Sequence, residues 1–131
     1  MKQLTRLVLL VSLAAWLSGC VVAIGNDGLE SRDSDWAEIE RDNRGAIDSL
    51  RLGMGIREAQ AVMPHEADFS EAFTVDGVAY RALFYRTHRV EGDGVTARNE
   101  TTPLIFANGE LAGWGESAWF DATGRTLAEV D

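Results

Sequence analysis

Apolar residues follow two different periods along the chain, and the change of period divides it into a helical part and a strand-rich part. Residues 34–50 repeat apolar positions at helical spacing, with Trp36 and Ile47 on one face and charged residues elsewhere. Ser34 and Asp35 are suitable caps, because their side-chain oxygens accept hydrogen bonds from the free amides of a first turn. The pattern predicts a helix over 34–50. It places Trp36 in the core-facing stripe, with a ligand-anchoring role for this residue as the alternative.

A glycine turn separates this helix from a second, shorter one. Gly53 and Gly55 interrupt the helical pattern, and residues 56–63 resume it until Pro64. Proline ends a helix because it lacks the amide hydrogen and its ring clashes with the preceding turn. Two short helices joined in this way can cover one face of a sheet.

From about residue 69 the apolar pattern takes the two-residue period of strands. Asp76-Gly77 and Asn108-Gly109 are strong hairpin signals, because a type I′ turn needs positive φ at both central positions. The strands are predicted at residues 69–75, 78–90, 102–107 and 110–120, with a polar loop at 91–99. The predicted fold is therefore α+β, with two N-terminal helices packed on a three- to four-stranded antiparallel sheet.

The predicted last strand has one nearly bare face. Trp114 alternates with Gly113 and Gly115, so the indole lies on one face while the glycines leave the other almost without side chains. Either the helices or a partner's backbone packs closely there. We expect Trp114 in the core, and Trp119 fits a core position and an exposed one equally. Both are candidate partner-binding residues.

The remaining polar residues give no pattern of catalysis or metal binding. His65 and His88 are far apart and no cysteine accompanies them, so we predict an ordinary surface position for each and no metal site. Gly92-Asp93-Gly94 is interpreted as a loop rather than a cation site. Arg81 and Arg86 are further candidate partner-binding residues, because they could form a basic strip; pairing with the many carboxylates is the alternative. No enzymatic activity and no cofactor are expected.

The N-terminus has the layout of a secretory leader. Lys2 and Arg6 precede the apolar residues 7–17, which are too few to span a membrane. Leu17-Ser18-Gly19-Cys20 resembles the lipobox of bacterial lipoproteins at every position. The resemblance implies cleavage before Cys20, diacylglycerol on its sulfur and an acylated amino terminus; an ordinary signal peptide or an uncleaved anchor is the alternative. Four segments follow: a signal peptide (1–19), the lipidated cysteine with a flexible tether (20–33), the folded domain (34–125) and a tail (126–131).

Charge and cysteine content narrow the possible partners. Removal of residues 1–19 takes away Lys2, Arg6 and no acid, so the net charge changes from −9 to −11. Such acidity argues against nucleic acid and anionic lipid surfaces. Cys20 is the only cysteine, so the domain has no internal disulfide. The lipid on Cys20 would be its only covalent addition.

Three segments within about residues 36–120 carry a resemblance to a known family: Leu52-Gly53-Met54, Leu83-Phe84-Tyr85-Arg86-Thr87, and Thr102-Pro103-Leu104-Ile105-Phe106-Ala107-Asn108-Gly109-Glu110-Leu111-Ala112-Gly113-Trp114-Gly115. Through these segments the chain resembles the BamE-like (SmpA/OmlA-type) group of small outer-membrane lipoproteins, and within it an uncharacterised proteobacterial family. Gly55 and Met63 depart from the group, which has a Ser or Thr cap and a glycine there. The resemblance implies two helices on an antiparallel sheet and a role in protein interaction.

The expected function follows from the anchor and the resemblance. We expect a non-enzymatic, lipid-anchored protein that binds another envelope protein in outer-membrane assembly or maintenance. We expect no nucleic acid as a partner, and the sequence identifies no small-molecule substrate. A periplasmic inhibitor or ligand-binding module that uses the open sheet face is the alternative. Resemblance to Gram-negative lipoproteins places it at the periplasmic face of the outer membrane, because Val21 stands where an Asp would signal inner-membrane retention. An inner-membrane lipoprotein is the second possibility.

Overall fold

The computed structural model describes residues 27–130, and their side chains from residue 35 onward. In this part of the chain the fold is α+β, with three α-helices and a four-stranded antiparallel sheet in the order β1-β2-β3-β4. The elements are α2 (Asp27–Ile47), α3 (Ile56–Val62), β1 (Phe69–Val75), β2 (Val78–Arg86), the 3-10 turn η1 (Arg98–Glu100), β3 (Thr101–Ala107), β4 (Glu110–Trp114), α4 (Gly115–Thr123) and the 3-10 turn η2 (Leu127–Glu129). The predicted leader, the lipobox and Cys20 lie outside the described residues.

The two predicted hairpin turns are confirmed. Asp76 and Gly77 have φ of 49° and 80°, and Asn108 and Gly109 have 49° and 86°. Both pairs therefore occupy the left-handed region that a type I′ turn requires at its central positions. The turns set the register of the flanking strands, so that β1 pairs with β2 and β3 pairs with β4 without long connections.

The first helix differs from the prediction at both ends. It begins at Asp27 instead of residue 34, so residues 27–33, expected as tether, are helical. Once the packed part of a helix has formed, adding further residues to it costs little free energy. Residues 27–33 can therefore be helical although their apolar residues show little helical spacing. At the other end the helix stops at Ile47, and a turn then brings Leu50 into the core at 6% exposure.

The second strand is shorter than predicted, because the chain leaves the sheet after Arg86 rather than at residue 90. The amides of Thr87 and His88 both donate to the carbonyl of Glu100, at 3.1 and 3.2 Å. Two successive amides that turn to one acceptor cannot continue the alternating ladder of a strand. The loop therefore begins four residues earlier than the apolar pattern suggested.

The prediction of one long strand over residues 110–120 is wrong. The strand ends at Trp114, and Gly115, with φ of +86°, reverses the chain into α4. The helix explains the bare face of the strand, since a Cβ placed on Gly113 would lie 3.0 Å from the Cβ of Ala118. The glycine thus lets α4 pack directly on β4, whereas the sequence had suggested the two N-terminal helices or a partner's backbone for this place.

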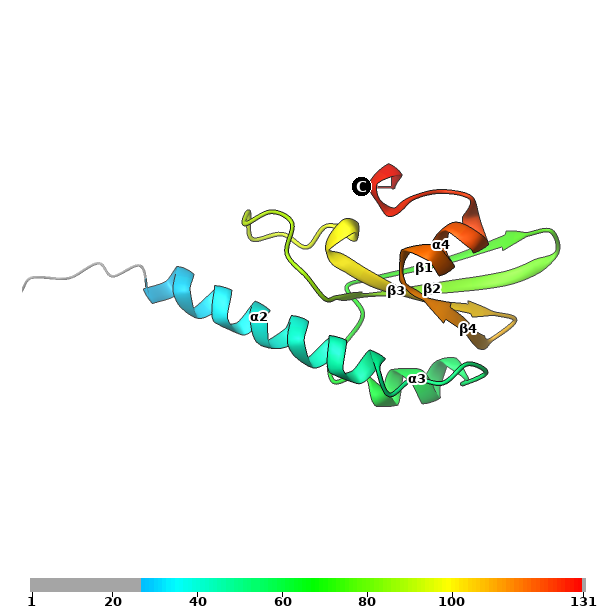
Figure 1. The fold of residues 1–131 in the computed structure, drawn as a ribbon, viewed down its shortest axis with the longest axis horizontal. Coiled ribbons are helices and arrows are strands. Elements are labelled where there is room, and N and C mark those ends of the chain that lie inside the picture. Colours follow the sequence, from blue (N-terminus) through cyan, green and yellow to red (C-terminus); the bar gives the residue numbers. More distant parts are fainter. Residues whose placement is uncertain (1–26, 131) are drawn as a thin grey trace, which may run out of the picture.

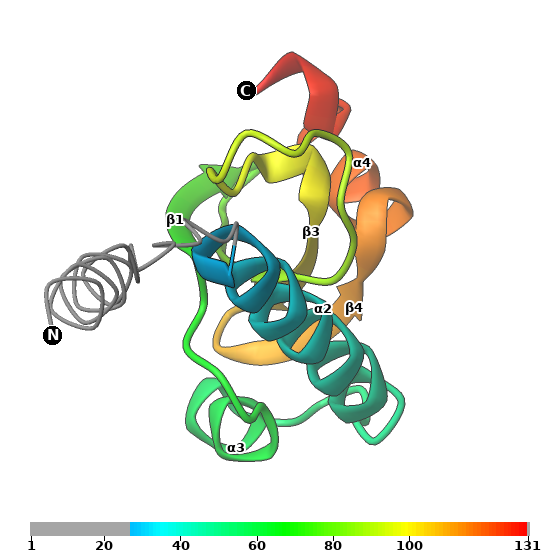
Figure 2. The same ribbon diagram turned by 90° about the vertical axis from the view of Figure 1, so that its left-hand side faces the viewer.

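Apolar side chains form one cluster on each face of the sheet. Figure 1 shows α2 and α3 on one side of the strands and α4 on the other, and Figure 2 shows the same layers after a quarter turn. The first cluster contains Ile47, Leu50, Met54, Ala59, Met63, Leu83, Tyr85, Leu104, Phe106 and Leu111. The second contains Ala82, Phe84, Ile105, Trp119, Ala122 and Leu127. Alternate residues of β2 and β3 enter opposite clusters, as the two-residue period of a strand dictates.

The two outer strands of the sheet differ in what lies beside them. The amide of Gly53 donates to the carbonyl of Leu111 at 2.8 Å, and the amide of Leu111 donates to the carbonyl of Met54 at 2.7 Å. Gly55 forms an isolated bridge with Glu110. The glycine turn before α3 therefore pairs with the outer edge of β4. Among the strands of the described residues, β1 pairs with β2 alone.

Candidate functional site

Arg86 lies at the centre of a buried polar cluster. Its side chain is 2% exposed, and its Nε donates to Glu40 Oε1 at 2.9 Å. Its Nη1 donates to Thr96 Oγ1 at 2.9 Å and to Glu100 Oε2 at 3.1 Å. A buried guanidinium needs such partners, because an unpaired buried charge is costly. Arg86 therefore joins α2, the 87–97 loop and η1 and presents no basic surface.

Trp36 covers the open face of this guanidinium. The Cζ atom of Arg86 lies 3.9 Å from the centroid of the Trp36 ring, a distance at which the ring quadrupole attracts the cation. Around the same residue, Asn43 Nδ2 donates to the Arg86 carbonyl at 2.8 Å, and the Arg86 amide donates to Asp68 Oδ2 at 2.9 Å. Trp36 is thus part of the packing of α2, the first of the two roles considered for it.

Glu100 organises the loop that follows β2. Its Oε1 accepts hydrogen bonds from the amides of Val90 and Glu91 at 2.8 and 3.0 Å, and its Oε2 accepts one from Ala97 at 3.1 Å. Burial alone would raise the pKa of Glu100, but these three amides and the Arg86 charge together hold it below its ordinary value. Glu100 therefore stays ionised and keeps the loop attached to the sheet.

The central part of the 87–97 loop is exposed. Val90 and Val95 are 56% and 63% exposed, and Asp93 Oδ1 accepts a hydrogen bond from the Val95 amide at 2.9 Å. The carboxylate of Gly92-Asp93-Gly94 thus closes a local turn, in keeping with the interpretation of this segment as a loop. A Cβ on Gly92 would require only the flexible guanidinium of Arg89 to move aside.

Arg81 has a different environment from Arg86. It lies on β2 opposite Ala72 of β1 and is exposed, and its side chain forms no hydrogen bond or ion pair with the described side chains and backbone of residues 35–130. It lines a groove of about 510 Å³ between α3 and the sheet; the other lining residues are Gln60, Met63, Pro64, His65, Glu66, Ala67, Ser70, Leu83 and Tyr85. The pKa of Tyr85 is raised by burial, so its hydroxyl stays protonated there. The groove thus combines polar and apolar side chains with the unpaired cation of Arg81.

The structure separates the two tryptophans that the sequence marked as candidates. Trp119 is 2% exposed and packs edge-on against Phe73 and Phe84, with centroids 5.7 and 5.4 Å away. Trp114 is 36% exposed at the end of β4, contrary to the expected core position, because the chain reverses directly after it. Trp119 therefore offers no surface to a partner, whereas Trp114 and also Phe120, which is 52% exposed, do.

The two histidines do not form a common site. His65 lines the groove with its Nε2 3.7 Å from Asp42 Oδ2, and the His88 ring nitrogen Nδ1 lies 3.1 Å from Thr87 Oγ1 at a separate hollow. No group of three or more His, Cys, Asp or Glu side chains suited to a metal ion occurs in the part of the chain that the structure describes.

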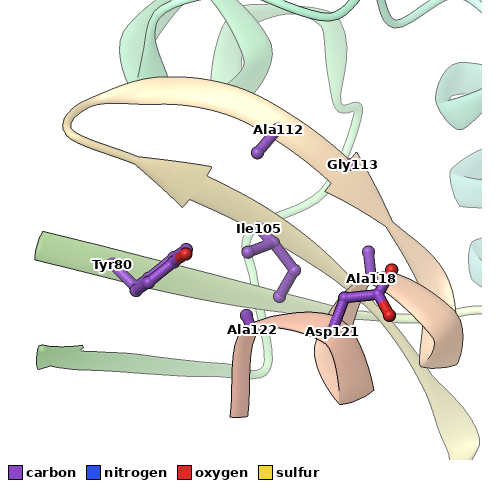
Figure 3. A pocket seen from close by; sticks show the side chains of 7 residues that line it. All are labelled: Tyr80, Ile105, Ala112, Gly113, Ala118, Asp121 and Ala122. Atoms are coloured by element: carbon purple, nitrogen blue, oxygen red, sulfur yellow. The ribbon is translucent and has the colours of Figure 1, made fainter. Parts of the chain in front are cut away.

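A smaller hollow of about 160 Å³ lies on the opposite face of the sheet. Figure 3 shows its lining from β2, β3, β4 and α4: Tyr80, Ile105, Ala112, Gly113, Ala118, Asp121 and Ala122. Asp121 is the only carboxylate among them, and the rest of the lining is mostly apolar or glycine. The hollow brings together no nucleophile with a general base.

Together these features define a small α+β domain. Its buried charged residues Arg86 and Glu100 fix the 87–97 loop to the sheet, and its groove contains the unpaired side chain of Arg81. The DUF3192 family, described as "Protein of unknown function", matches residues 18–121, and the chain belongs to this family. The matched region includes Cys20 and all four strands. Comparison with curated proteins and with solved structures gives no match.

The cluster around Arg86 and Glu100 was not predicted as a unit. Glu100 directly precedes β3 and Arg86 ends β2, and their pairing depends on the register of Arg86 with Thr101. The only local signal that could have indicated this ion pair is the presence of a charged residue where one apolar strand ends and another where the next apolar strand begins.

Proposed function

We propose that this protein is a non-enzymatic, lipid-anchored lipoprotein that binds another protein in the cell envelope. The sequence Leu17-Ser18-Gly19-Cys20 supports the anchor, since each position suits lipidation of the cysteine. Several acyl chains on one amino terminus give stable membrane attachment, at about 0.8 kcal/mol for each buried methylene. No helix within residues 27–130 is long and apolar enough to cross a membrane.

The proposed location is the periplasmic face of the outer membrane, with a role in outer-membrane assembly or maintenance. Val21 and the BamE-like segments support this location. The proposed BamE-like arrangement has α2 and α3 on one face of the sheet, and the shared apolar cluster of Ile47, Ala59 and Leu104 supports it. Here α4 is an additional helix on the other face.

The groove beside α3 is the proposed contact surface, and Arg81 is the observation that carries the proposal. Exposed ion pairs contribute little energy, so on a chain of net charge −9 an exposed arginine can stay available for a carboxylate of a partner. Arg81 lies unpaired beside Gln60, Ser70 and the buried Tyr85. This pattern suits a partner segment that brings its own carboxylate to Arg81 and fills the groove with apolar side chains.

A comparison of anchored and unanchored protein tests the membrane half of the proposal. The amino-terminal peptide of the membrane-purified protein is expected to carry the mass of acyl chains, and Cys20→Ala is expected to release the protein from the membrane fraction. An unmodified Cys20 in the membrane-purified protein would contradict the anchor.

Site-specific cross-linking tests the groove. A photoreactive residue at Gln60 in the full chain is expected to give the same cross-linked band in the parent and in Arg57→Glu, and to lose it in Arg81→Glu. Arg57 is a matched control, because it is an exposed arginine on α3 that does not line the groove. An equal band in both charge reversals would exclude Arg81 as a contact.

A periplasmic inhibitor or ligand-binding module is the second candidate. The exposed side chains of Ser70, Ala72 and Thr74 on β1 leave half of this sheet face open, which favours a flat contact with a folded enzyme. Capture of barrel-assembly components only by the anchored protein would support the first function. Capture of one periplasmic enzyme by both the anchored protein and Cys20→Ala would support the second.

A further inference from the structure

The outer edge of β1 lacks most of the features that normally protect an exposed strand. Proteins block such edges with proline, charged side chains, a bulge or a covering segment, because free backbone groups pair with other strands. Residues 69–75 contain no proline, no lysine and no bulge, and their one charged residue, Glu71, is paired with Arg98 of the same chain. In the described part of the chain β2 is the only strand that pairs with β1. This edge is therefore chemically ready to accept another strand.

The hydrogen-bond alternation identifies which backbone groups face outward. Asn108 donates to the carbonyl of Ala79 at 2.7 Å, so the odd-numbered residues of β2 bond toward β3 and the even-numbered ones bond toward β1. Their partners on β1 are Phe69, Glu71, Phe73 and Val75. The amides and carbonyls of Ser70, Ala72 and Thr74 therefore point away from the sheet.

We propose that two copies of this chain pair through β1, antiparallel and centred on Ala72. The three outward-facing residues are symmetric about Ala72, so a two-fold axis there places Ala72 opposite Ala72 and Ser70 opposite Thr74 of the second copy. Each of these three pairs exchanges two hydrogen bonds, as in any antiparallel ladder. The two four-stranded sheets become one continuous sheet, and the contact is isologous, the commonest kind in homo-oligomers.

The side chains fit this register without a charge conflict. Glu71 is the only charged residue of β1, and it pairs with Arg98 of its own chain. In the dimer Glu71 faces Phe73 of the second copy, so no like charges oppose each other. Val75, 37% exposed, faces the half-buried Phe69 of the second copy. On the other face the side chains are Ser70, Ala72 and Thr74, which are small enough for close approach.

The net charge predicts how the stability of the β1 dimer changes with salt, and this change distinguishes the strand contact from an ion-paired one. Each copy carries a net charge of −9, so the copies repel at long range, whereas the strand contact contains no pair of opposing charges. Raising the salt from about 50 to about 500 mM screens this repulsion and is expected to tighten the dimer, the reverse of an ion-paired contact. The pairing depends on the β1 edge alone and not on Arg81 or on the lipid.

Cysteine cross-linking in intact cells tests the register. In the full chain, Ala72→Cys places two Cα atoms about 5.5 Å apart across the dimer, within the range of a disulfide. Oxidant is expected to give a disulfide-linked dimer with Ala72→Cys and not with Ala112→Cys, the matched exposed alanine on β4. Equal cross-linking of the two variants, or none with Ala72→Cys, would overturn the proposal.

Charged substitutions of Ala72 test the equilibrium between monomer and dimer. Sedimentation of the full chain in detergent is expected to show a dimer, with a dissociation constant below about 1 mM. Ala72→Lys and Ala72→Glu are each expected to weaken the dimer about fivefold or more, and their mixture to restore it as a heterodimer. Ala72→Pro is expected to abolish the dimer, because proline removes the backbone amide hydrogen of residue 72, which points away from β2 and donates to the second copy. A monomeric parent, or a dimer unaffected by all three substitutions, would exclude this contact.

Discussion

The guanidinium carbon of Arg86 lies 3.9 Å from the centroid of the Trp36 ring, and this contact attaches α2 to the end of β2. The indole covers a charge that is 2% exposed, while Glu40 on the same helix accepts a hydrogen bond from it. These three side chains thus join α2 to β2 through charged and aromatic contacts, in addition to the apolar contacts of Ile47.

Removing the indole should therefore loosen α2. We expect Trp36→Ala to lower the free energy of unfolding by about 1–3 kcal/mol, from lost packing and the lost cation–π contact, and Trp36→Phe to lower it by less. Urea unfolding followed by circular dichroism measures the change. Trp114→Ala, at an exposed tryptophan, is the control with a smaller expected loss; an equal loss would remove any special role for the Trp36 contact.

Glu100 should be one of the most sensitive charged positions. Glu100→Gln is expected to cost about 2–4 kcal/mol at neutral pH, because it leaves Arg86 without a buried countercharge and weakens the bonds to three amides. Hydrogen exchange at Val90, Glu91 and Ala97 should speed up. Glu58→Gln, which breaks an exposed pair 3.6 Å long with Arg51, should cost less than about 1 kcal/mol.

The depressed pKa of Glu100 gives the stability a defined pH dependence. The folded state holds this pKa below its ordinary value of 4.5, so the unfolded chain takes up the proton first as the pH falls. The contribution of Glu100 is therefore complete above about pH 5 and is lost as the pH falls through the folded-state pKa. Unfolding measured from about pH 6 to pH 3 should show the gap between the parent and Glu100→Gln narrowing with acid. A constant gap would contradict the low pKa.

Local chemistry made the hairpins and the second helix predictable. Asp76-Gly77 and Asn108-Gly109 need only positive φ at adjacent positions, and Pro64 ends α3 through its own ring. These features depend on residues next to one another, so the sequence carried enough information to place β1, the start of β2 and α3.

Features that depend on register or on distant packing were not predictable in this way. Residues 110–120 alternate as a strand would, and the alternation hides the positive φ of Gly115 and the contact of Gly113 with Ala118. Arg86 was considered for a basic strip or for pairing with carboxylates, and the structure has the pairing; nothing near it in sequence indicates that its partners are Glu40 and Glu100. The candidate groove was equally hidden, although its residue Arg81 was among those singled out.

The close contact between β4 and α4 can be tested by exchanging volume. Gly113→Val should lower the free energy of unfolding by about 1–3 kcal/mol, since its side chain meets Ala118, and Ala118→Gly should recover part of the loss when the two are combined. Gly45→Ala is the control: nothing lies within 4 Å of its added Cβ, so this helical site should gain about 0.5–1 kcal/mol. Additive effects of Gly113→Val and Ala118→Gly would show that the two residues do not touch.

The pairing of the glycine turn with β4 decides how far strand addition could proceed. Gly53 and Met54 already bond to the amide and carbonyl of Leu111, so another strand cannot pair with β4 at this position. A chain with two open edges could recruit copies without limit and grow into fibrils. Because the β4 edge is already paired, each molecule has only the β1 edge available for another strand. Pairing with a second copy through β1 uses that edge, so the assembly stops at a dimer and does not grow into a fibril.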